Sequence, residues 1–265
     1  QWVRFTPGLD PRAPTCMRYP QATPYAFSID FDKVTDMKAL QEVCKANAIL
    51  ADEQPKKTEM NVASVVVSIG AELFDPSILD NFGGGKYANV VTGLAYERIM
   101  SASGPTMGQL KRPSDGVRPK RVAWIQCVGS RGLNKGDVPY CSSVCCMYAL
   151  KEAIVTKERF AADIEAVIFY MDMRTFGKDY ERYLNRAKEE YHVRLVRSRP
   201  HSIIEDPVTK NLSITYTTDE EAKLQKYPNY TVKEARTTLF TRSILILIVA
   251  ILFNGIGTAT AMNGP

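Results

Sequence analysis

The fold is decided by residues 121–171, which read RVAWIQCVGSRGLNKGDVPYCSSVCCMYALKEAIVTKERFAADIEAVIFYM. The segment opens on a short apolar run, residues 122–126, which predicts a strand. Residues 127–139 are rich in glycine and predict a loop, and residues 142–160 have the composition and apolar stripe of a helix. Residues 165–171 are again apolar and predict a second strand. Strand, helix and strand in this order indicate a right-handed βαβ unit with parallel strands.

The same alternation continues along the chain and extends the sheet. Residues 178–191 carry apolar side chains at helical spacing, and residues 193–196 form the next apolar run. Residues 203–205 and 212–217 flank a turn-forming stretch and predict a hairpin. We therefore predict an α/β fold with a Rossmann-type βαβ parallel sheet followed by a β-meander. This is the arrangement of the nucleotide domain in flavin disulfide reductases.

Three other segments have sequence patterns that predict their secondary structure. Five prolines within residues 1–30 forbid long regular elements, so we expect an irregular N-terminal part followed by a short helix over residues 36–48. Residues 62–69, VASVVVSI, predict a strand buried on both faces. Residues 243–253, SILILIVAILF, fall short of the roughly 20 apolar residues of a membrane span. A buried strand is the favoured interpretation there, and a membrane segment remains the alternative.

Four of the six cysteines, Cys127, Cys141, Cys145 and Cys146, are spaced C-x13-C-x3-C-C. Cys127 follows the first predicted strand at its carboxyl end, the edge where open α/β sheets bind ligands. We expect Cys141 and Cys145 to share one helical face, because they are four residues apart. Gathered thiolates suit iron–sulfur clusters or zinc, and the adjacent pair fits poorly with C-x2-C zinc knuckles. The spacing favours a cluster, while zinc, a redox disulfide and inert thiols remain alternatives.

The turn after the first strand lacks the glycine pattern of a dinucleotide site. The fingerprint G-x-G-x-x-G is replaced by Cys127-Val-Gly129-Ser-Arg-Gly132, with cysteine in the first glycine position. We therefore do not expect NAD(P) here and assign this place in the fold to a metal site. Arg174 and Lys178 follow the second strand, where a nucleotide domain contacts phosphate, although solvated loop charges are the favoured interpretation.

Composition excludes several functional classes. An apolar content of 45% and a charged content of 24% over 265 residues are typical of a globular protein of one to two domains. The net charge is +5, and the Lys and Arg residues are spread along the chain and mixed with Asp and Glu. No nucleic-acid partner is therefore expected. The cysteines are too few for a disulfide scaffold and the N-terminus has no signal-peptide pattern, which favours a cytoplasmic protein. No Ser/His/Asp set, carboxylate pair or P-loop occurs, so no catalytic residue is assigned.

Several stretches closely resemble the A subunit of heterodisulfide reductase and its relatives in the quinone-interacting oxidoreductase of sulfate reducers. The resemblance covers roughly residues 18–218. It is carried by residues 120–149, IFYMDMRTFGKDYE at 168–181, YPQATP at 19–24, VVVSIGAELFDP at 65–76 and SASGPTMGQLKRPSDG at 101–116.

The resemblance implies a flavoprotein with a thioredoxin-reductase-like fold that binds FAD. It also implies a 4Fe–4S cluster that is held by the four cysteines. The turn from Ser68 to Gly70 resembles the family's flavin-proximal turn, and Arg131 lies in the cluster loop. We therefore assign Ser68, Gly70 and Arg131 to cofactor binding. The family's N-terminal glycine fingerprint for FAD is absent from these residues, so we expect a fragment of a larger flavoprotein.

The same resemblance divides the chain into four parts. Residues 1–61 are a proline-rich entry and a degenerate ferredoxin-like insert, in which only Cys44 of the family's ligand pattern is kept. Residues 62–119 are the remainder of an FAD-type domain, residues 120–218 the Rossmann-like domain with the cluster, and residues 219–265 a poorly matching tail with a buried strand.

The expected function is electron transfer between FAD and the cluster, and onward to other subunits. Those partners belong to a heterodisulfide-reductase-like or quinone-interacting redox complex, and peripheral membrane association through one of them is an option. The alternative is a zinc- or cluster-stabilised interaction module without redox turnover.

Overall fold

The computed structural model describes residues 14–17, 23–51, 57–67, 73–133, 136–160, 163–217, 237–238 and 246–250. The chain divides near residue 70 into two compact units. The described part of the first unit contains an antiparallel strand pair and a short helix. Its elements are β1 (Thr15–Met17), β2 (Phe27–Ile29), the 3-10 turn η1 (Phe31–Lys33) and α1 (Met37–Val43). Asp36 begins α1 by accepting a hydrogen bond from the Ala39 N–H. The predicted short helix is confirmed for residues 37–43, whereas residues 44–48 are not helical.

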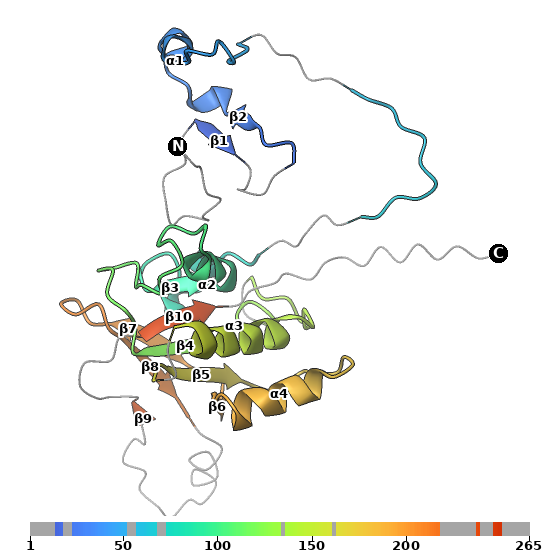
Figure 1. The fold of residues 1–265 in the computed structure, drawn as a ribbon. Coiled ribbons are helices and arrows are strands. Elements are labelled where there is room, and N and C mark those ends of the chain that lie inside the picture. The colour runs from blue at the N-terminus through green and yellow to red at the C-terminus, as the bar shows by residue number, and fades with distance from the viewer. Residues whose placement is uncertain are drawn as a thin grey trace, which may run out of the picture. The chain divides into compact units, whose positions relative to one another are not determined.

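The second unit alternates strands and helices and then adds a hairpin (Figure 1). Its elements in chain order are η2 (Pro76–Ile78), η3 (Asp80–Phe82), β3 (Val90–Thr92), α2 (Gly93–Met100), β4 (Arg121–Ile125), α3 (Cys145–Arg159), β5 (Glu165–Tyr170), α4 (Tyr180–Glu189), β6 (Arg194–Arg197), β7 (Ser202–Glu205), β8 (Leu212–Tyr216), β9 (Thr237–Thr238) and β10 (Ile246–Ala250).

The strands of this unit form two sheets. A five-stranded parallel sheet has the order β3-β10-β4-β5-β6, and a three-stranded antiparallel sheet has the order β7-β8-β9. From β4 the chain passes outward through β5 and β6, and later returns to place β10 on the other side of β4. The strand order therefore reverses at β4, the position in open α/β sheets where ligands bind. The predicted βαβ units and hairpin are confirmed.

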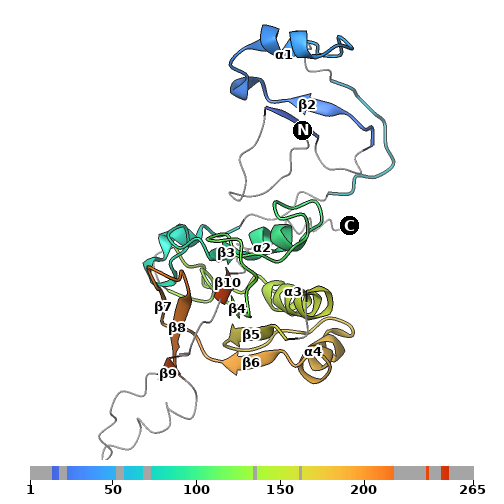
Figure 2. The ribbon, with the colours of Figure 1, turned by 60° about the vertical axis from the view of Figure 1, so that its left-hand side comes forward.

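Each face of the parallel sheet has its own core. Along β4, Val122 and Trp124 pack with residues of α2, α3 and α4, whereas Ala123 and Ile125 pack with residues of the antiparallel sheet. Figure 2 shows α3 and α4 beside β5 and β6, with the β7–β8 hairpin on the far side of the sheet. The middle residues of β4 and β5 are thus buried on both faces of the sheet, as expected for parallel sheets.

The apolar tail contributes a strand to the middle of the sheet. Ile246–Ala250 pairs in parallel with β3 on one side and with β4 on the other. The strand interpretation of residues 243–253 is confirmed for these five residues, and the remainder of the run lies outside the described residues. Among the described helices, none has the length and apolar character that crossing a membrane requires.

The strand predicted over residues 62–69 is wrong for residues 62–67, which form neither strand nor helix. Val65, Val66 and Val67 have exposed fractions of 75%, 87% and 69%. A β-branched run becomes a buried strand only where a neighbouring strand completes its hydrogen bonds, and no described strand pairs with these residues. Ser68 and Ile69 lie outside the described residues.

A buried carboxyl group links the sheet to α3. The indole Nε1–H of Trp124 donates to Glu152 Oε2 at 2.9 Å, and Glu152 Oε1 has no hydrogen-bond partner among the described residues. Trp124 also packs edge-on against Tyr96 of α2, with ring centroids 5.6 Å apart. Burial raises the pKa of Glu152 well above its ordinary value of 4.5, against the Trp124 hydrogen bond, which lowers it. At a pH between the unfolded and the folded pKa values, Glu152 is therefore protonated in the folded protein and ionised in the unfolded chain.

Replacing this carboxyl should flatten the pH dependence of stability. Because the folded-state pKa of Glu152 is raised, its stabilising effect is complete below the unfolded pKa and is lost as pH rises toward the folded pKa. This loss amounts to up to about 1.4 kcal/mol per pH unit, and Glu152→Gln should remove it. Urea unfolding at a series of pH values measures the slope. Glu189→Gln, at an exposed position of α4, is the matched control, and equal slopes in wild type and Glu152→Gln would contradict this account.

Candidate metal centre

The candidate site lies at the carboxyl edge of the parallel sheet, where β4 and β5 end together. Ile125 is paired with Phe169, and the N–H of Gln126 donates to the Phe169 carbonyl oxygen at 3.0 Å. Cys127 follows directly, with a φ of 59° in the left-handed region. This conformation costs a non-glycine residue about 1–2 kcal/mol. A strained residue at a strand end is characteristic of functional sites.

The loop after Cys127 folds back on itself. Gly129 has a φ of 70°, and a Cβ atom there would stand 2.5 Å from the ring of Phe74, so this turn requires glycine. The N–H of Val138 donates to the Gly129 carbonyl oxygen at 3.0 Å, and the N–H of Arg131 donates to the Tyr140 carbonyl oxygen at 3.2 Å. These bonds return the chain to the sheet edge, so Cys141 comes back toward Cys127.

The helical arrangement predicted for Cys141 and Cys145 is wrong, because α3 begins only at Cys145. Ser143 has a φ of 64°, a left-handed conformation that interrupts the helix on its N-terminal side. The Ser143 N–H instead donates to Cys141 Sγ at 3.3 Å. Only Cys145 and Cys146 therefore lie in the first turn of α3, and Cys141 belongs to the turn that precedes it.

Three of the four cysteines are buried. Cys127, Cys145 and Cys146 have exposed fractions of 4%, 3% and 4%, and Cys141 is half-buried. Each of the four interacts electrostatically with at least one other, since Cys127 is affected by Cys141 and Cys146, and Cys145 by Cys127 and Cys146. The four side chains therefore lie in one neighbourhood at the sheet edge.

The thiols of this site differ in acidity. Burial raises the pKa of Cys127, against the opposing effect of Arg131. Cys145 donates a hydrogen bond to Cys146, which lowers the pKa of Cys146 to about 7 and raises that of Cys145. Cys146 is thus the thiolate of the adjacent pair, and thiolates are the form that binds metals.

Charged side chains line the same edge of the sheet. Arg131 Nη1 lies 4.0 Å from Cys127 Sγ and also donates to Asp172 Oδ1. Arg174 Nε donates to Asp172 Oδ2 at 2.9 Å. The hydrogen bond to Asp172, and then the charge of Cys141, raise the pKa of Arg174. Arg174 is therefore bound to a carboxylate at the cysteine site rather than being a freely solvated loop charge.

The predicted site residues are only partly tested by this geometry. The four cysteines and Arg131 share one edge of the sheet, whereas Ser68 and Gly70 lie outside the described residues. In the described part of the chain, no three His, Cys, Asp or Glu side chains stand close enough together to hold a metal ion. Sequence reasoning did not identify Asp172. Its signal was a carboxylate two residues after β5, at the edge where Cys127 also emerges.

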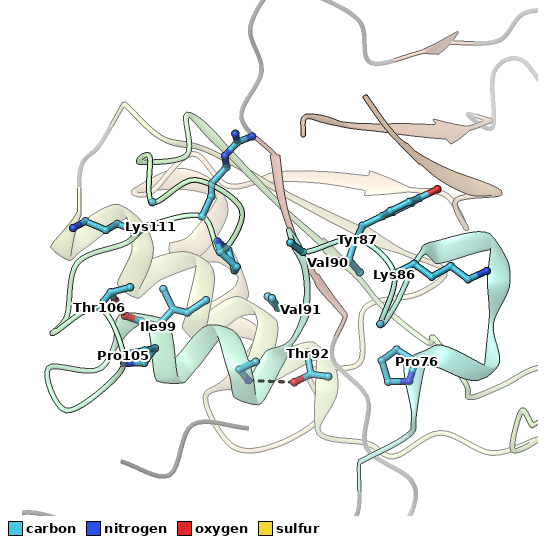
Figure 3. A pocket seen from close by; sticks show the side chains of 16 residues that line it. Pro76, Lys86, Tyr87, Val90, Val91, Thr92, Ile99, Pro105, Thr106 and Lys111 are labelled. Carbon is cyan, nitrogen blue, oxygen red and sulfur yellow. Dashed lines mark hydrogen bonds between the residues drawn. The ribbon is translucent and has the colours of Figure 1, made fainter. Parts of the chain in front are cut away.

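A pocket of about 810 Å³ lies elsewhere, along β3 and α2 (Figure 3). Val90, Val91 and Ile99 line its apolar wall, and Lys86 and Lys111 also border it. The described residues that line it include none of the four cysteines. This volume is within the range of small-molecule sites. In its described lining, the pocket therefore shares none of the four cysteines with the candidate metal centre at the sheet edge.

One thiolate should be detectable in the metal-free, reduced protein. Because the Cys145 thiol stabilises the Cys146 thiolate, ultraviolet titration from about pH 5 to about pH 9 should show a thiolate with an apparent pKa of about 7. Cys146→Ser should remove this titration, whereas Cys44→Ser should leave it unchanged. A titration that survives in Cys146→Ser would show that the assignment is wrong.

Comparison with known proteins identifies the relatives of this chain. No family model matches it. It is 44% identical over 210 residues to an iron–sulfur A subunit (number 2) of CoB–CoM heterodisulfide reductase from Methanopyrus kandleri, covering 79% of this chain and 32% of that protein. It is 39% identical over 226 residues to the A subunit of the H2:CoB–CoM heterodisulfide, ferredoxin reductase of Methanothermobacter marburgensis, covering 85% and 33%.

A third relative is the A subunit of the ferredoxin/F420H2-dependent CoB–CoM heterodisulfide reductase of Methanosarcina acetivorans. The chain is 41% identical to it over 173 residues, covering 65% of this chain and 22% of that protein. The chain thus spans a third or less of the length of these relatives. Over most of its own length, this chain is a homologue of the heterodisulfide reductase A subunit.

Proposed function

We propose that the chain is part of an electron-transfer subunit of a heterodisulfide-reductase-like oxidoreductase, in which Cys127, Cys141, Cys145 and Cys146 bind a 4Fe–4S cluster. The observation that carries the proposal is the presence of the four cysteines at the carboxyl edge of the sheet, with Cys127 in a left-handed conformation. An iron–sulfur centre is also named in a relative that is 44% identical to this chain.

The chemistry of the donor set fits such a cluster. Four thiolates are the usual ligands of a 4Fe–4S centre, which supplies one-electron transfer when it is bound. Cys145 and Cys146 lie in the first turn of α3, where backbone N–H groups and the helix dipole favour thiolates. Both also belong to the apolar core between α3 and the sheet, which excludes water from this side of the site. Arg131 places a positive charge beside the Cys127 sulfur.

FAD is the second cofactor of the proposal. Its support is the sequence resemblance together with the thioredoxin-reductase-like arrangement that we propose for the fold. Ser68 and Gly70 remain the proposed flavin-proximal residues, and Arg131 is proposed to act at the cluster. The proposed domain boundaries, residues 1–61, 62–119, 120–218 and 219–265, follow from the same resemblance.

The proposed partners are the other subunits of a redox complex, to which the cluster passes electrons. Heterodisulfide reduction is one setting, and it is the activity named in the methanogen relatives. Quinone-linked sulfate respiration is the other, because only Cys44 of the ferredoxin-like pattern is present. We place the protein in the cytoplasm, and in the second setting one of its partners provides the contact with the membrane.

A metal-stabilised interaction module without redox turnover is the second candidate function. The burial of Cys127, Cys145 and Cys146 favours it, because structural metal sites are closed to solvent. The two candidates differ in the metal that is bound and in whether it can be reduced.

Single cysteine substitutions test the proposal. In the protein purified without oxygen, changing any of the four cysteines to serine should lower the bound iron per chain or change its electron paramagnetic resonance spectrum, because one iron then loses its thiolate ligand. Iron and sulfide analysis with electron paramagnetic resonance measures the loss. Cys44→Ser is the matched control and should keep the iron content of wild type. Zinc in place of iron, or an unchanged spectrum in Cys145→Ser, would refute the proposal.

A further inference from the structure

The carboxylate of Asp172 is divided between two arginines at the cysteine site. Oδ1 accepts from Arg131 Nη1 and Oδ2 accepts from Arg174 Nε. The backbone of Asp172 lies close to the cysteines as well, because its carbonyl oxygen is 4.0 Å from Cys146 Sγ. One residue shortly after β5 therefore contacts both arginines and one of the cysteines.

Arg131 stands between Asp172 and the nearest sulfur. The same nitrogen, Nη1, bonds the carboxylate and lies 4.0 Å from Cys127 Sγ. The Arg131 side chain is 23% exposed, so without its carboxylate partner it has open solvent to turn into. Arginine side chains lose considerable rotamer freedom when they are fixed, and a charged hydrogen bond compensates for this loss. Asp172 thus fixes where the positive charge of Arg131 acts.

We propose that Asp172 is a positioning residue that holds the guanidinium of Arg131 against the Cys127 sulfur and thereby raises the reduction potential of the cluster. The inference rests on the proposed cluster. A fixed positive charge beside a sulfur ligand stabilises the reduced cluster, which carries one more negative charge than the oxidised one. Arg174, held by the other oxygen, places a second positive charge near Cys141.

The sign of the potential shift separates positioning from a direct charge effect. Removing the negative charge of Asp172 alone would make the potential more positive. If Asp172 acts by holding Arg131, Asp172→Ala releases that cation and makes the potential more negative. Arg131→Gln should also shift the potential to a more negative value, and Asp172→Ala should add no further negative shift in the Arg131→Gln background.

Redox titration of the intact protein, followed by electron paramagnetic resonance, measures these midpoint potentials. Lys178→Gln, which removes an exposed cation from the same segment, is the control and should leave the potential unchanged. If Asp172→Ala loses iron, Asp172→Asn is measured with and without Arg131→Gln. The proposal requires the shift in midpoint potential that Asp172→Asn causes to differ between the protein with Arg131 and the Arg131→Gln variant.

Two outcomes would overturn the inference. One is a midpoint potential of Asp172→Ala that is unchanged or more positive while the cluster is intact. The other is a substitution at position 172 that shifts the potential equally with Arg131 present and in Arg131→Gln. Failure of the proposed function is recognised separately, since wild-type protein would then bind no reducible iron at these cysteines.

Discussion

The parallel pairing of β4 with β5 is the constraint on which the site depends. Its register sets Ile125 beside Phe169, so the residues that follow both strands emerge at one edge of the sheet. Cys127 emerges from the first strand and Asp172 from the second, and the loop before α3 returns to the same edge, where α3 begins with Cys145 and Cys146. A shift of the register by one residue would turn these side chains to the opposite face and separate the cysteines from the charges that accompany them.

Much of the second unit could be predicted from sequence, because hydrophobic periodicity there agrees with the packing. The strand and helix between residues 121 and 159, the hairpin and the strand at Ile246–Ala250 all follow from local patterns. The run at residues 62–67 could not be predicted in this way. β-branched residues favour a strand when the segment lies inside a sheet, but a strand also needs a neighbouring strand to pair with. No described strand pairs with residues 62–67.

The candidate site was predictable in its residue types and less so in its geometry. The cysteines were recognisable from spacing, but the left-handed conformation of Ser143, which shortens the predicted helix at its N-terminal end, has no sequence signal in a serine. Asp172 was not predictable because its role depends on contacts with Arg131 and Arg174 that the sheet creates. Positive charge near the thiolates and burial of the adjacent pair have opposite effects on the thiol pKa values.

The most direct test of the central claim is a crystal structure of the protein prepared without oxygen, with anomalous diffraction measured at the iron absorption edge. The account predicts four iron atoms at the carboxyl edge of β4 and β5, each bonded to one of Cys127, Cys141, Cys145 and Cys146. A single zinc ion at this place, or iron held by other residues while these four cysteines remain free, would contradict it.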